Sequence, residues 1–115
     1  MSEPARLPAQ LEVSGLVRQV QAAGGFAAVL HRGHAEGGTI LLVLTENGSN
    51  TRVYERMPDP SGHRVWAVSR MEDIENKSEL SHWLARRSAQ DDDLWIVELD
   101  IANAERFIPS QAARG

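Results

Sequence analysis

The chain contains no cysteine among its 115 residues, and aromatic residues make up only 5% of it. The first absence excludes disulfides, thiol nucleophiles and cysteine-based zinc sites. Uninterrupted apolar runs are short, as in Ile40 to Leu44, whereas a membrane-spanning helix needs roughly 20 apolar residues. Positive charge is also scarce, since 12 Lys and Arg stand against 16 Asp and Glu. This balance disfavours binding to nucleic acid or to an anionic membrane.

The length predicts a single domain over residues 1–115, because one core of this size folds without a metal or a disulfide. We expect an ordered core at about residues 7–108 and flexible tails at 1–6 and 109–115. The segment Met1 to Pro4 has neither a basic region nor an apolar core, so no signal peptide is expected. Together with the lack of cysteine, this predicts a cytoplasmic protein.

The N-terminal part alternates apolar and polar residues from Leu7 to Val13. Such a period of two predicts a half-buried strand, with Pro8 at its edge. Ser14 is then suited to cap a helix that ends at Gly24. A single helix beginning at about Leu11 is the alternative for the same region.

Four further strands follow from short apolar or alternating runs. They are expected at residues 26–30, 39–45, 51–57 and 64–69. Turns separate the last three strands, one with Asn47-Gly48, which tolerates positive φ, and one at residues 58–62. A second helix is predicted at 73–87, a strand at 94–99, and a short terminal helix after Asp100.

The predicted order is therefore β-α-β-β-β-β-α-β. Four successive strands with short connections predict an antiparallel meander. We expect an α+β fold, a two-layer sandwich of a mainly antiparallel sheet with two helices on one face. The apolar helix faces and central strands predict these core residues: Leu16, Val20, Val43, Leu80, Trp83, Leu84 and Ile96.

Four segments stand in an order that resembles a bacterial family, domain of unknown function 1491 (DUF1491). They are Val13-Ser14-Gly15-Leu16-Val17-Arg18, residues 22–27, residues 39–44, and Ala85-Arg86-Arg87 leading to Asp93-Leu94-Trp95-Ile96-Val97-Glu98. The resemblance covers about residues 7–100 and implies no activity. Many members have Asp-Pro-Asp where this chain has Asp91-Asp92-Asp93, so the proline that would tighten that turn is missing.

One catalytic pattern is Asp59 followed by Glu75-Asn76-Lys77, which matches the acid and acid-x-lysine signature of metal-dependent nucleases. The second acid and the lysine should then share a strand face. Here both fall at the start of a predicted helix, where residues two apart do not share a face. A turn and a helix surface are the alternative interpretation. Ser61 and His63 are close in sequence, but no nucleophile elbow surrounds them.

Histidines and acids provide two further candidates for metal binding. His31, His34, His63 and His82 could supply imidazoles to zinc, with Glu36 near the first two. Clustered acids at Asp91-Asp92-Asp93, with Glu98 and Asp100, could hold calcium or magnesium. The alternatives are scattered surface histidines and a solvated acidic loop that offsets Arg86 and Arg87. For Glu98 we favour an ion pair with Arg52 or Arg56 across the sheet.

Glycines at Gly33, Gly37 and Gly38 could cradle a phosphate if they joined a strand to a helix. They join two predicted strands instead, so a flexible hairpin loop is the interpretation that we favour. We therefore predict no metal or cofactor and name no catalytic residue.

Basic and aromatic residues gather on two adjacent predicted strands, a composition that is enriched at protein interfaces. The predicted interaction surface consists of Arg52, Tyr54, Arg56, Arg64 and Trp66. The sequence thus favours a small non-catalytic interaction module that self-associates. Its expected partner is a second copy of the chain, in a homodimer, or else an unknown protein. The alternative is a small-ligand-binding protein or a metal-dependent enzyme that uses the histidines and acids.

Overall fold

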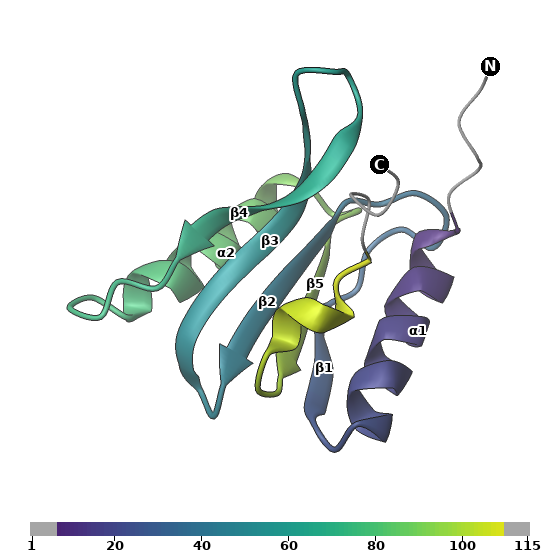
Figure 1. The fold of residues 1–115 in the computed structure, drawn as a ribbon. Helices are drawn as coiled ribbons and strands as arrows, with labels where there is room; N and C mark the ends of the chain where they lie inside the picture. Colours follow the sequence, from purple (N-terminus) through teal and green to yellow (C-terminus); the bar gives the residue numbers. More distant parts are fainter. Residues whose placement is uncertain (1–6, 110–115) are drawn as a thin grey trace.

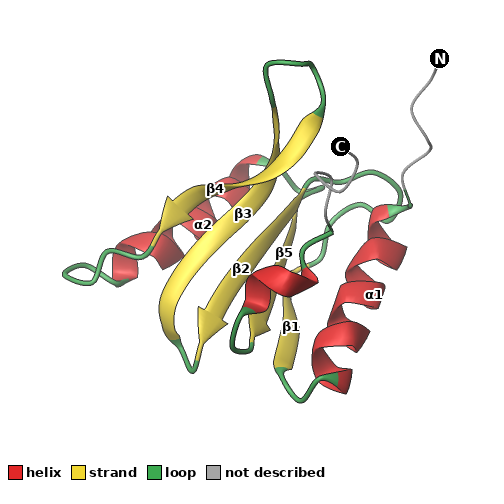
Figure 2. Cartoon of the chain, viewed as in Figure 1, coloured by secondary structure: helices red, strands yellow, loops and turns green. Residues whose placement is uncertain are grey.

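The computed structural model describes residues 7–109. Its elements are helix α1 (Ala9–Ala22), strands β1 (Phe26–His31), β2 (Ile40–Glu46), β3 (Ser49–Pro58) and β4 (Arg64–Met71), helix α2 (Ser78–Gln90), strand β5 (Trp95–Asp100) and the 3-10 helix η1 (Ala104–Phe107). Figure 2 shows these elements as one sheet with helices around it. The predicted tails 1–6 and 109–115 lie outside the described residues, apart from Pro109.

The sheet has the strand order β1-β5-β2-β3-β4. Three of its pairings are antiparallel, and only β2 and β5 run parallel. The predicted α+β class with a mainly antiparallel sheet is therefore confirmed. The predicted four-strand meander is wrong in one respect: only β2, β3 and β4 form it, because β5 lies between β1 and β2.

The two helices pack on opposite faces of the sheet, and the predicted two-layer sandwich with both helices on one face is wrong. Along β2, Ile40, Leu42 and Leu44 pack with α1, whereas Leu41 and Val43 pack with α2. Figure 1 shows α1 and η1 in front of the sheet and α2 behind it. A strand that buries both faces is apolar at every position, which explains the continuous run from Ile40 to Leu44.

The predicted first strand is absent, because the segment from Ala9 onward belongs to α1. Four residues at helical spacing, Ala9, Val13, Leu16 and Val20, form its buried stripe. Leu7 and Leu11, which suggested the alternation, are exposed. The helix ends at Ala22, and Gly24, the predicted left-handed stop, follows two residues later with a φ of +91°. Its first free N–H groups, at Ala9 and Gln10, donate to the carbonyls of Glu36 and Ala35.

The structure can also be compared with the predictions at two turns and at the start of the second helix. Asn47 and Gly48 both have positive φ, which confirms the expected turn between β2 and β3. The second helix begins at Ser78 rather than at residue 73, and Ile74 before it is 76% exposed. Asp91 accepts a hydrogen bond from the Asp93 N–H, and Leu94 N–H donates to the Asp91 carbonyl. The turn is therefore tight without a proline.

Five of the predicted core residues are buried: Leu16, Val20, Val43, Leu80 and Ile96. Trp83 and Leu84 are only partly buried and pack at the edge of the α2 core. No helix in residues 7–109 is long and apolar enough to cross a membrane.

Candidate functional site

The predicted interaction surface comes from β3 and β4, and its residues lie on the face that α1 and η1 share. Tyr54 and Trp66 pack against the core on that side. The Arg56 guanidinium lies over the Trp66 ring, 4.5 Å from its centroid. The strands thus bring these side chains together, but most of their polar groups have partners inside the molecule.

Arg52 is buried within this surface, being only 6% exposed. Its Nε donates to Glu105 Oε2 at 2.8 Å and its Nη2 to Glu105 Oε1 at 2.7 Å. A third bond runs from Nη1 to the Asn50 carbonyl, and Glu46 lies 3.5 Å away. Arg52 therefore ties η1 to the sheet. An interaction surface here stays a prediction, and the exposed Arg64 is its most accessible member.

Glu105 is the residue that the sequence analysis missed at this surface. The hydrogen bonds from Arg52 lower the pKa of Glu105 from its ordinary 4.5 to about 2. The Tyr54 hydroxyl also donates to Glu105 Oε2, and burial followed by the charge of Glu105 raises the pKa of Tyr54. This carboxylate is therefore held in its charged form at neutral pH.

The expected pairing of Glu98 with an arginine of the sheet is wrong. Arg52 pairs with Glu105 and Glu46, and Arg56 pairs with Glu12 of α1. Glu98 follows Val97 on β5 and so points to the opposite face, the one that α2 covers in part. In the same way Arg86 and Arg87 pair with Glu79 and Glu55, so the Asp91 to Asp93 acids do not offset them.

The nuclease pattern is split between the two ends of β4. Asp59 lies in the turn before this strand, and Glu75 and Lys77 lie in the loop after it. Eight residues of strand span roughly 25 Å. Asp59 instead accepts hydrogen bonds from Ser61 and His63, and the Ser61 bond is the main cause that lowers its pKa. The pattern thus describes a turn and a loop.

The histidines are likewise held by local partners. His31 Nδ1 lies 2.6 Å from the Leu94 carbonyl oxygen, and His34 Nδ1 accepts from the N–H groups of Glu36 and Gly37. His63 contacts Ser61, and His82 is exposed on α2. Within residues 7–109, no group of three or more His, Asp and Glu side chains is placed to hold a metal ion.

The glycine-rich loop packs closely against the start of β5, and it is not the predicted hairpin, because β5 lies between β1 and β2 in the sheet. A Cβ at Gly38 would lie 1.9 Å from the Asp93 carbonyl oxygen, and one at Gly33 would lie 2.2 Å from it. His34 N–H donates to that same oxygen, and Trp95 Nε1 donates to the His34 carbonyl at 2.8 Å. The loop therefore packs backbone to backbone against the start of β5 and holds the Trp95 ring in place.

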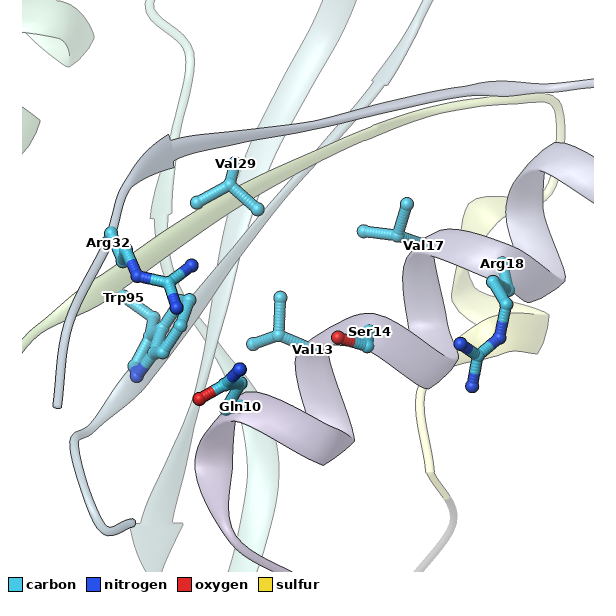
Figure 3. A pocket seen from close by; sticks show the side chains of 8 residues that line it. All are labelled: Gln10, Val13, Ser14, Val17, Arg18, Val29, Arg32 and Trp95. Carbon is cyan, nitrogen blue, oxygen red and sulfur yellow. The ribbon is translucent and has the colours of Figure 1, made fainter. Parts of the chain in front are cut away.

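A hollow of about 290 Å³ opens between α1 and the end of β1. Its walls come from α1, from β1 and the residue that follows it, and from β5. The lining residues are Gln10, Val13, Ser14, Val17, Arg18, Val29, Arg32 and Trp95. Figure 3 shows Arg32 and Trp95 at one end, Arg18 at the other, and the valines between them. No local motif connects Arg18 to Arg32, so the sequence analysis did not find this site.

The model of the family described as "Protein of unknown function (DUF1491)" matches residues 7–109. The chain belongs to the DUF1491 family. No match was found among curated proteins.

Solved structures agree with the DUF1491 assignment. The crystal structure of a DUF1491 family protein from Caulobacter crescentus CB15 has a TM-score of 0.78 and 24% identity, covering 91% of this chain and 97% of that one. The NMR structure of a DUF1491 family protein from the same organism has a TM-score of 0.76 and 23% identity, with 93% and 96% covered. The solution structure of protein Atu0922 from A. tumefaciens has a TM-score of 0.68 and 30% identity, with 86% and 89% covered. These likenesses support the fold of this DUF1491 chain and name no activity.

Proposed function

We propose that this protein is a non-catalytic interaction module that self-associates through the open edge of β1. The observation that carries the proposal is the composition of that edge. Strand β1 has a single strand neighbour within residues 7–109, namely β5. Three of its large apolar side chains are exposed, with Phe26 at 60%, Leu30 at 54% and Val29 at 43%.

The two edges of the sheet differ in how they are protected. Charged residues on an edge strand discourage pairing with another chain. The β4 edge carries Arg64 and Arg70, whereas β1, with the sequence Phe-Ala-Ala-Val-Leu-His, carries neither lysine, arginine nor proline. Only a register irregularity between Val29 and His31 disturbs it. The β1 edge is therefore the better surface for strand addition.

A second copy of the chain suits this edge as a partner. Antiparallel pairing of β1 with itself about a two-fold axis would set apolar residues opposite apolar residues and bring no like charges together. The two sheets would then join into one continuous sheet. We place the module in the bacterial cytoplasm: the similar structures come from bacteria, and the lack of cysteine is compatible with a reducing compartment.

Light scattering at micromolar protein concentrations tests the proposal. We expect twice the chain mass of 12.7 kDa for the wild type, and the monomer mass for Leu30→Lys. Val68→Lys is the matched control, because Val68 is 43% exposed on the opposite edge strand; it should remain dimeric. A monomeric wild type, or a dimer that survives Leu30→Lys and is lost in Val68→Lys, would contradict pairing through β1.

A further inference from the structure

The hollow between α1 and β1 combines an apolar floor with two cationic ends. Val13 and Trp95 form the floor and are almost completely buried. Val17 and Val29 continue it towards solvent. Gln10 and Ser14, on the side of α1, add an amide and a hydroxyl group at the wall. An apolar cavity with a few placed polar groups is the usual composition of a small-molecule site.

The two arginines of the hollow are unlike the other arginines in residues 7–109. Five of the others, Arg52, Arg56, Arg70, Arg86 and Arg87, form ion pairs with acids. Arg64 and Arg106 donate to backbone carbonyls. Arg18 and Arg32 form neither an ion pair nor a hydrogen bond within the described part of the chain. Their donor groups are therefore available to a ligand.

Arg32 is also placed by its surroundings. Its Cζ lies 5.3 Å from the centroid of the Trp95 ring, which favours a position over the ring face through a cation–π interaction. The ring itself is fixed by its bond to the His34 carbonyl. A guanidinium that is oriented before binding loses less freedom when a carboxylate arrives.

From this arrangement we infer that the hollow binds a small aliphatic carboxylate. The guanidinium fork pairs with a carboxylate through two parallel hydrogen bonds, and the aliphatic part lies on the valine and tryptophan floor. The volume of about 290 Å³ is near the lower end of the range of ligand pockets, roughly 300–1,000 Å³, so the occupant is a small molecule. The inference does not depend on self-association through β1.

Titration with hexanoate, followed by amide and indole N–H signals in NMR, tests this inference. The chain has three tryptophans, so the indole region reports on three separate places. We expect the Trp95 signal and the amides of Val13, Val17 and Val29 to shift, while the Trp83 signal on the opposite face stays unchanged. The neutral analogue 1-hexanol should bind about tenfold more weakly, because it forms no ion pair with arginine. Equal affinities for the two probes would overturn the inference.

Variants show whether the hollow itself binds the probe. Arg18→Gln and Arg32→Gln together should weaken hexanoate binding by at least about tenfold, the size of one charge-assisted interaction. Arg106→Gln removes one positive charge from an exposed position of η1, outside the hollow, and should leave binding unchanged. Ser14→Leu keeps both arginines but fills the cavity, and should also abolish binding. Hexanoate affinity that is unchanged in the double variant and in Ser14→Leu would refute the site.

The same titration on Leu30→Lys separates this inference from the proposed function. Leu30 does not line the hollow. Hexanoate binding that persists in a monomeric Leu30→Lys protein supports an independent ligand site. If the shifts vanish in this variant while its fold is intact, the hollow is completed only by a second copy, and the inference as stated is wrong.

Discussion

Arg52 and Glu105 are joined by two hydrogen bonds of 2.8 and 2.7 Å, although 53 residues separate them in the sequence. The arginine is buried in β3 and the carboxylate belongs to η1 near the end of the described chain. The pair fastens η1 over β2 and β3 and closes that part of the core.

Removing the Glu105 carboxylate should lower the stability of the fold. Glu105→Gln leaves the buried arginine without its charged partner, and we expect the free energy of unfolding to fall by about 1–3 kcal/mol. The partial exposure of Glu105 places the effect in the lower half of that range. Glu79→Gln, which breaks the more exposed pairs with Arg70 and Arg86, should cost less than about 1 kcal/mol. Urea unfolding measures both, and equal losses would contradict a special role for Arg52 and Glu105.

The depressed pKa of Glu105 predicts a specific acid sensitivity. Because its pKa is about 2 in the folded chain and near 4.5 otherwise, the stabilisation is complete above pH 4.5 and is lost as the pH falls from 4.5 towards 2. Unfolding free energies measured over this window should fall more steeply in the wild type than in Glu105→Gln. Asp59, whose pKa is also lowered, is present in both proteins and cancels in the comparison. Parallel curves would contradict the prediction.

Two neighbouring glycines should respond very differently to an added methyl group. A Cβ at Gly38 would overlap the Asp93 carbonyl oxygen, whereas a Cβ at Gly37 meets nothing within 4 Å. Gly38→Ala should therefore cost about 1–3 kcal/mol, as overpacking against backbone does. Gly37→Ala should stay within about 0.5 kcal/mol. Thermal unfolding of the two variants is a direct check, and a tolerant Gly38 would mean that the loop can move away from β5.

Trp83 and Trp95 provide a comparison between two tryptophan environments. Trp95 is 1% exposed, and its replacement by alanine should cost about 3–5 kcal/mol. Trp83 is partly buried, with the Cζ atoms of Arg70 and Arg87 5.2 and 5.3 Å from its ring centroid. Trp83→Ala should cost less, about 1–3 kcal/mol, since a smaller area returns to water. Denaturant midpoints in the reverse order would show that α2 carries more of the core than its burial indicates.

The sequence predicted most elements, but it placed a strand where α1 begins and put both helices on one face of the sheet. At the N-terminus, alternation from Leu7 to Val13 coincided with a helical stripe through Ala9, Val13 and Leu16, and three or four residues are too few to separate the two periods. The clue to the layers was available in Ile40 to Leu44. A strand that is apolar at every position is covered on both faces, which is incompatible with two helices on one side.

The site could be predicted less well than the fold, for a physical reason. Arg52 and Glu105 meet only because η1 folds back over β2, and Arg18 and Arg32 line the same hollow only because α1 lies against β1. Neither pair has a spacing that a local pattern would detect. Burial decided the rest: Arg52 and Arg56, which the sequence placed on an exposed basic surface, pair with Glu105 of η1 and Glu12 of α1, whereas Arg64 of the same surface stays exposed.

The position of β5 between β1 and β2 also bears on the order in which the chain acquires its structure. Strand β1 is synthesised before β5, which is its only sheet neighbour within residues 7–109 and which begins at Trp95, after β2, β3, β4 and α2. The β2-β3-β4 meander can form while synthesis continues, because its contacts are local. The α1-β1 segment cannot complete its sheet pairing until β5 has been synthesised. Completion of this fold is therefore a late, non-local event, and the nascent chain is most vulnerable to aggregation just before β5 emerges.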